Sequence, residues 1–223
     1  MVSEILRMVR GTSLIKKALS EFVSMIGNCD YLYNESWRVL STQENIEKIP
    51  QYFFDRDIIV NGQEKEIRRL LLEHLSINPL HDLSGALALM SLVKDAERIG
   101  DYSKNLFEVG ILYKGTVKNI KYFDRLAANQ IEIAGNFPKL KEAFEKSDAK
   151  MAQEILDKYV PIKKECDRIL YDLFDENLSP NEAIATGMLT RHFKRINSHL
   201  SNIASGIIYP LEEIDFVKGD LLE

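Results

Sequence analysis

The feature that most constrains the fold is a regular apolar stripe near the carboxyl end of the chain. Its members, separated by steps of three and four residues, are Leu189, Phe193, Ile196, Leu200, Ile203 and Ile207. Side chains at this spacing lie along one face of an α-helix and form a seam between packed helices. Short alternating β-branched runs, which would indicate strands, are nearly absent. The sequence therefore predicts an all-α protein.

The positions of glycine and proline divide the chain into helical segments. There are only 11 glycines and 6 prolines among 223 residues, and they cluster at a few places. Between them the helical period predicts six segments, at residues 13–40, 42–77, 80–113, 117–147, 148–177 and 179–209. We expect a kink at 136–138 and a disturbance at Pro161. Ser179 followed by Pro180 is typical of a helix start, with the serine as cap.

The apolar stripe has a counterpart earlier in the chain. Subtracting 97 from its residue numbers gives Leu92, Ala96, Ile99, Ser103, Leu106 and Gly110, which are again mostly apolar or small. A repeat of this length predicts that one three-helix unit occurs twice. We therefore expect a tandem pair of antiparallel three-helix bundles, residues 1–113 and 114–213, followed by a tail at 214–223.

Bulk composition excludes several classes of protein. The chain is 45% hydrophobic and 28% charged with a net charge of −5, which is ordinary for a soluble globular protein. The acidic balance argues against nucleic-acid binding, because no basic excess exists to neutralise phosphates. The sequence contains no run of about 18 apolar residues, so no membrane-spanning helix is expected. The amino-terminal stretch lacks the unbroken apolar region of a signal peptide. We interpret Cys29 and Cys166 as small buried apolar groups.

Two acids on one helical face are the main candidates for function. Glu97 and Asp101 are four residues apart, so their like charges destabilise an isolated helix by a few tenths of a kcal/mol. Nearby cations, solvent or a bound metal must compensate this repulsion. In the second copy of the repeat the matching positions are Lys194 and Ser198, so both acids are lost there.

Several stretches, taken in order, resemble the PhoU family of phosphate-uptake regulators. The core at 97–101, Glu-Arg-Ile-Gly-Asp, is similar to the family signature. Residues 57–61 are similar to its D-x-x-x-N stretch, and residues 79–83 to its P-x-x-D-L-R, with Ser84 in place of the arginine. Residues 191–196 and 202–203 resemble a second, altered copy of the signature.

The resemblance implies both a fold and a role. The fold is two three-helix bundles, with metal clusters held by acid-x-x-x-acid motifs. The role is that of a cytoplasmic regulator, not an enzyme, peripheral to the inner face of the membrane. Its implied partners are phosphate transporter components and a phosphate-sensing histidine kinase, and a homodimer is compatible with it.

The candidate metal ligands come from the first copy alone. They are Asp57, Asn61, Glu97 and Asp101. Oxygen ligands suit Mg²⁺, Mn²⁺, Ca²⁺ or iron, and Zn²⁺ is a further candidate. In the second copy Lys163 and Lys194 would repel a cation, or replace it as fixed positive charge beside Asp167. The sequence thus predicts one carboxylate site at most.

Other interpretations remain open at this level. The chain could be a metal-dependent helical-bundle enzyme or a metal-storage protein, although no histidine has the E-x-x-H spacing of di-iron bundles. It could also be a degenerate PhoU-like interaction module for another transporter. The four histidines are interpreted as surface or boundary residues rather than ligands: His74, His81, His192 and His199. An aromatic group is interpreted as a core edge or a partner surface: Tyr31, Tyr33, Trp37, Tyr52, Phe53 and Phe54.

Overall fold

The computed structural model of this chain describes residues 13–42 and 48–215. The α-helices of this part are α2 (Ser13–Thr42), α3 (Gln51–Ile77), α4 (Leu83–Leu112), α5 (Phe123–Ala134), α6 (Asn136–Lys146), α7 (Ala149–Asp175) and α8 (Pro180–Ile208). Two short 3-10 helices, η1 (Val117–Asn119) and η2 (Leu211–Glu213), complete the regular elements of the described residues. The predicted all-α class is confirmed. Within the described ranges no helix is long and apolar enough to cross a membrane.

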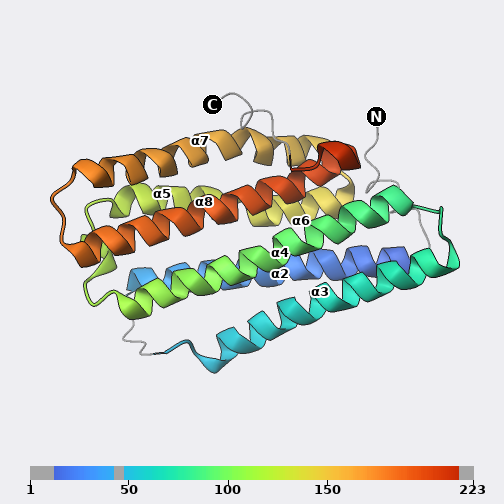
Figure 1. Ribbon diagram of the computed structural model, residues 1–223, viewed down its shortest axis with the longest axis horizontal. Coiled ribbons are helices and arrows are strands. Elements are labelled where there is room, and N and C mark those ends of the chain that lie inside the picture. The colour runs from blue at the N-terminus through green and yellow to red at the C-terminus, as the bar shows by residue number, and fades with distance from the viewer. Residues whose placement is uncertain (1–12, 43–47, 216–223) are drawn as a thin grey trace.

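The helices form two bundles that lie side by side (Figure 1). In the first, α2, α3 and α4 pack against one another, and in the second α5 and α6 together take the place of one helix beside α7 and α8. The two bundles meet where α4 packs along α8 and α2 packs against α6. The predicted tandem arrangement is therefore confirmed. The boundaries at 113 and 213 stay a prediction, because buried residues of both bundles belong to one hydrophobic cluster.

The two apolar stripes, on α4 and α8, are buried between packed helices. Every member of the α8 stripe is fully buried, and so are its counterparts on α4 from Leu92 to Leu106. The two helices are in close contact at Gly206, where a Cβ atom would lie 2.5 Å from Cδ1 of Leu92. Glycine permits this approach because it has no side chain.

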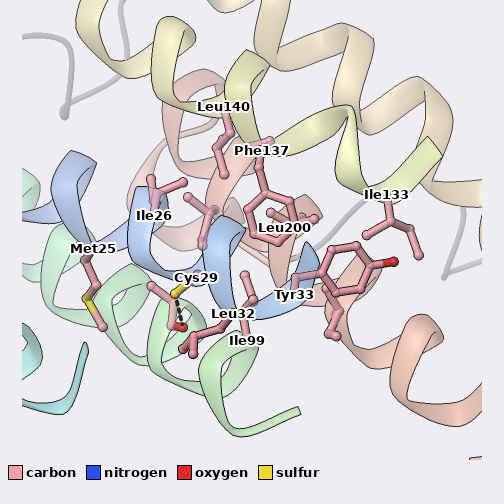
Figure 2. Packing of buried hydrophobic residues seen from close by; sticks show 14 of the residues in the cluster. Met25, Ile26, Cys29, Leu32, Tyr33, Ile99, Ile133, Phe137, Leu140 and Leu200 are labelled. Carbon is pink, nitrogen blue, oxygen red and sulfur yellow. Dashed lines mark hydrogen bonds between the residues drawn. The ribbon is translucent and has the colours of Figure 1, made fainter. Parts of the chain in front are cut away.

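Aromatic side chains fill the space between the bundles. The ring centroid of Tyr33 on α2 lies 5.5 Å from that of Phe137 on α6 and 6.0 Å from that of Phe193 on α8. Figure 2 shows Tyr33 and Phe137 among the aliphatic side chains of this core. Such pairs contribute about 0.5–1.5 kcal/mol each beyond the burial of their area. Tyr33 and Phe53 are therefore core residues, not parts of a partner surface.

Three prolines lie where the predicted segments can be compared with the observed helices. The second segment was expected from 42, but α3 begins at Gln51, after Pro50 in extended conformation; residues 43–47 lie outside the described ranges. The kink expected at 136–138 is a break between two helices at Gly135, because the ring of Pro138 would clash with the carbonyl of Ala134 in a continuous helix. In contrast, α7 continues through Pro161.

Candidate functional site

The four candidate ligands lie on two helices of the first bundle that face each other. Asp57 and Asn61 are on α3, and Glu97 and Asp101 are one turn apart on α4. The helices come close because α4 carries a glycine here: a Cβ atom on Gly100 would lie 4.0 Å from Oδ1 of Asp57. The structure therefore brings Asp57 next to the predicted acid pair.

Each of the three carboxylates has a basic neighbour. Oε2 of Glu97 lies 2.7 Å from Nζ of Lys94, one turn earlier on α4. Oδ2 of Asp101 accepts a hydrogen bond of 2.9 Å from Nη1 of Arg98. These cations provide the compensation that the like charges of Glu97 and Asp101 require.

Asp57 is the most buried member of the candidate set. Asp57 is 9% exposed, and its Oδ2 lies 4.0 Å from Nζ of Lys104. Burial raises the pKa of Asp57, Lys104 opposes that shift, and the negative charge of Asp101 adds to it. The amide of Asn61 is turned toward its own helix, where Nδ2 donates to the backbone oxygen of Asp57 at 3.1 Å. The charge of Asp101 on α4 thus acts on Asp57 on α3.

As arranged here, these residues fit an ion-pair network rather than a cation site. Oxygen atoms suit a hard cation, but one would have to displace Lys94, Arg98 and Lys104. Asp57, Glu97 and Asp101 are also not among the sets of described residues whose ligand atoms all lie within 4.8 Å of one another. The metal site at Asp57, Asn61, Glu97 and Asp101 therefore stays a prediction.

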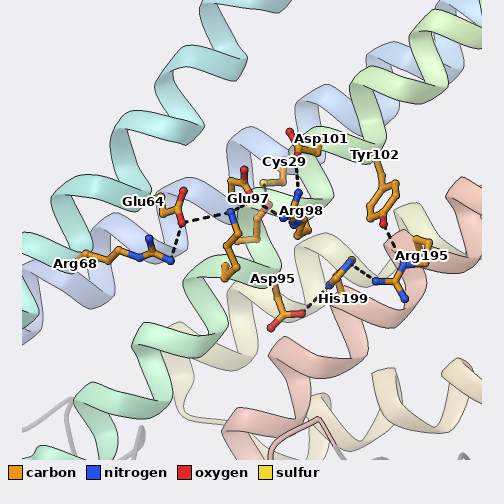
Figure 3. A network of polar contacts seen from close by, with 12 residues as sticks. Cys29, Glu64, Arg68, Asp95, Glu97, Arg98, Asp101, Tyr102, Arg195 and His199 are labelled. Carbon is orange, nitrogen blue, oxygen red and sulfur yellow. Dashed lines mark hydrogen bonds and ion pairs between the residues drawn. The ribbon is translucent and has the colours of Figure 1, made fainter.

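Sequence reasoning missed part of this network. Glu64 on α3 is a buried residue, 8% exposed, whose Oε1 forms an ion pair with Nη2 of Arg68 at 2.8 Å (Figure 3). The same oxygen lies 3.7 Å from Nζ of Lys94. Lys94 thus links Glu64 on α3 to Glu97 on α4. The seven-residue step from Asp57 to Glu64 could have indicated that both lie on one helical face.

The second bundle replaces the acid pair by fixed positive charge, as the sequence predicts. Nζ of Lys194 on α8 forms an ion pair with Asp167 on α7. Ser198, at the position of the second acid, lies 3.3 Å from the hydroxyl of Tyr159. This bundle holds a lysine–aspartate pair where a two-carboxylate site would lie.

The comparison with known families decides the assignment of the first bundle. A sequence model of the PhoU domain matches residues 22–109, which run from α2 to near the end of α4. The chain contains a PhoU domain. A search of curated proteins by sequence found no match.

Solved PhoU structures share the fold of both bundles. PhoU from Pseudomonas aeruginosa superposes with a TM-score of 0.79 at 19% sequence identity, covering 90% of this chain and 98% of that one. The phosphate transport system regulatory protein PhoU from Streptococcus pneumoniae superposes with a TM-score of 0.76 at 16% identity, covering 88% and 94%. The second bundle therefore keeps the PhoU fold, although the sequence match ends at residue 109.

A polar cluster joins the PhoU domain to the second bundle across the α4–α8 seam (Figure 3). Nδ1 of His199 lies 2.7 Å from Oδ1 of Asp95, and Nδ2 of Asn202 donates to the same oxygen at 2.9 Å. Arg195 donates from Nε to the hydroxyl of Tyr102 at 3.2 Å. His74 and His199 are buried, so their interpretation as surface or boundary residues was wrong.

The internal repeat relates two contacts in this seam. Adding 97 to Asp95 gives His192, and adding 97 to Tyr102 gives His199. The contact between Asp95 and His199 therefore corresponds to the contact between His192 and Tyr102, whose ring centroids are 5.8 Å apart. Beside the first contact, partial burial and the charge of Asp95 raise the pKa of Asp215 to about 6, and His199 opposes that shift.

Proposed function

We propose that this PhoU-domain protein is a cytoplasmic regulator of phosphate uptake and phosphate-starvation signalling. It acts through contacts with components of a phosphate transporter, with the sensor kinase of that system, or with both, at the inner face of the membrane. It catalyses no reaction in this role. The observation that supports this most strongly is the PhoU domain at residues 22–109.

The charged face shared by α3 and α4 is the surface that we assign to these contacts. Arg98 is 49% exposed and pairs with Asp101, which is 36% exposed. Exposed ion pairs contribute only about 0–1 kcal/mol, so a partner's charges can replace the internal pair at little cost. Charge patterns of this kind determine specificity and association rate more than affinity.

The regulator role is tested in a strain that lacks the gene for this chain. We expect phosphate-starvation genes to be expressed in high phosphate in this strain, and wild-type protein to restore their repression. Normal control of those genes in the deletion strain would count against the regulator role.

The assigned surface is tested by charge reversal in the same strain. Arg98→Glu should fail to restore repression, whereas Arg168→Glu on α7 should restore it. Arg168 is a matched control, because it is an exposed arginine with an acid three residues away, Glu165, at 3.6 Å. Full restoration by Arg98→Glu would reject the surface and leave the role in place.

The proposal includes at most one cation site made of carboxylates, and this site lies on α3 and α4. Elemental analysis of protein purified without chelator tests it, comparing wild type with Glu97→Ala/Asp101→Ala. A metal content that falls in the double variant supports the site. An unchanged content rejects it and leaves the ion pairs of Lys94 and Arg98 as the function of these acids.

A PhoU-like interaction module that serves another transporter is the second candidate. The pair of Lys194 with Asp167 supports it, because the second bundle has exchanged an acidic position for a basic one. Under this alternative, phosphate control is normal in the deletion strain, and the protein purifies together with components of a different transporter.

A further inference from the structure

A second group of metal-binding side chains lies at the turn between α3 and α4. His74 is on the last turn of α3, His81 lies in the connection, and Asp82 immediately precedes α4. One ligand atom of each lies within 4.8 Å of the others. Glu97 lies about 22 Å further along α4 by the helical rise, so this group is separate from the carboxylates described above.

The two histidines are held in place around the turn. His74 is fully buried, and its Nε2 lies 3.0 Å from the backbone oxygen of His81. The two imidazole rings are 6.0 Å apart and nearly perpendicular. A hydrogen bond from one ring nitrogen to a backbone carbonyl is the usual way in which proteins orient a metal-binding histidine.

Asp82 is in an unusual state for the residue that precedes a helix. An aspartate at this position normally caps the helix by accepting a backbone hydrogen bond, but the side chain of Asp82 makes no such bond. Its Oδ2 is shielded from solvent. Instead that oxygen lies 2.7 Å from Nδ1 of His81. The carboxylate is therefore directed at the imidazole of His81, and an ion bound to one of these two side chains would lie beside the other.

We propose that His74, His81 and Asp82 bind a Zn²⁺ ion, with a fourth position open to solvent. Two imidazole nitrogens and one carboxylate oxygen are a ligand set that Zn²⁺ takes when it keeps an open position. Zinc–ligand distances of about 2.0–2.1 Å place tetrahedral ligands about 3.3 Å apart, so the three atoms need only a small movement. His81 is exposed, which gives the ion access from solvent.

Binding would replace the contact between His81 and Asp82 by bonds from both side chains to one ion. The ion accepts a lone pair from each imidazole and from the Asp82 carboxylate, and any proton on a ligating nitrogen is released to solvent. The ion then connects the end of α3 to the start of α4. Because Zn²⁺ binds the folded state through residues at the end of α3 and just before α4, it should raise Tm.

The ligand set distinguishes this site from the predicted carboxylate site. Imidazole favours Zn²⁺ and its neighbours in the first transition row, whereas Mg²⁺ and Ca²⁺ prefer oxygen ligands. Excess Mg²⁺ should therefore not compete with Zn²⁺ at His74, His81 and Asp82. The proposal does not depend on the regulatory function above.

The test uses full-length protein freed of its affinity tag and stripped with chelator. Isothermal titration with Zn²⁺ in excess Mg²⁺ should give one ion per chain, with proton release that changes with the buffer, and a matching rise in Tm. His81→Gln and Asp82→Asn should each weaken binding at least about tenfold, since even outer-shell partners change metal affinity by 10–100-fold. His81 is exposed, so His81→Gln should fold normally, as checked by circular dichroism.

Two controls make the outcome decisive. His192→Gln removes a histidine from the α4–α8 seam and should leave Zn²⁺ binding unchanged, and so should Glu97→Ala/Asp101→Ala. No binding to wild type, or equal binding in His81→Gln, overturns the proposal. Loss of binding in the Glu97/Asp101 double variant alone also overturns it and assigns the ion to the carboxylates.

Discussion

The imidazole of His199 on α8 lies 2.7 Å from a carboxylate oxygen of Asp95 on α4, and each side chain is only 10% exposed. The pair joins two residues that are 104 positions apart and belong to different bundles. It lies in a seam that also contains buried apolar side chains such as Leu92. The association of the two bundles therefore depends on a buried charged group as well as on apolar packing.

Removing Asp95 should destabilise the protein. Asp95→Ala leaves His199 and Asn202 without their shared acceptor, and hydrogen bonds to a charged group contribute roughly 1.5–3 kcal/mol. We expect the free energy of unfolding, measured with urea, to fall by about that amount. Asp101→Ala is the matched control: Asp101 is 36% exposed and pairs with Arg98, so roughly 0–1 kcal/mol should be lost. Equal losses in the two variants would contradict the prediction.

His192 should make stability depend on pH. Burial, aided by the charge of Arg191, lowers the pKa of His192 in the folded protein from 6.5 to about 4. Between these values the unfolded chain binds the proton more readily, so the free energy of unfolding should decrease as pH falls from 6.5 toward 4.

The variant His192→Phe tests this, because it cannot titrate. Both ring nitrogens of His192 are shielded from solvent and have no hydrogen-bond partner among the described residues, so the substitution loses no hydrogen bond there. Urea unfolding at several pH values should show a smaller decrease for the variant than for wild type. Parallel curves would rule out His192 as a source of the pH dependence.

Two glycines should respond in opposite ways to alanine. At Gly206 a Cβ atom would lie 2.5 Å from Cδ1 of Leu92, which is fully buried, so Gly206→Ala should cost about 1–3 kcal/mol from overpacking, less its gain in helix propensity. At Gly62 no atom lies within 4 Å of the added Cβ, so Gly62→Ala should gain about 0.5–1 kcal/mol. Thermal and urea unfolding measure both. A stabilised Gly206→Ala would mean that α4 and α8 can separate without loss.

The two cysteines should be unreactive in the folded protein. Both are buried and free, and burial raises the pKa of Cys166 to about 12 and that of Cys29 further still. Because the thiolate is the reactive form, native protein at mildly alkaline pH should react with a disulfide reagent only as it unfolds. The two thiols should react at once in urea. Rapid reaction of native protein would show that one of them is accessible.

The sequence by itself determined the helices and the faces that they bury. The stripe from Leu189 to Ile207 predicts a helix and its buried side because the 3.6-residue period is a local property. The hydroxyl of Ser179 accepts the amide of Glu182, as expected from the cap and the proline that follows it. The replacement of an acid by Lys194 was also readable, and the ion pair with Asp167 confirms the positive charge beside that residue.

Contacts within one helix could be predicted from the sequence, whereas contacts between helices could not. The pair of Lys94 with Glu97 follows from a spacing of three residues. The approach of Lys104 to Asp57 depends on how α3 lies against α4, which no local period encodes.

Only the tertiary structure placed Asp95 beside His199 and gathered His74, His81 and Asp82 at one turn. The first contact requires the register between two antiparallel helices from different bundles. The second depends on the left-handed backbone of Asp82, with φ of 57°. Periodicity states which face of a helix is buried, but the register of packed helices and the path of a turn depend on side chains that meet only after the chain has folded.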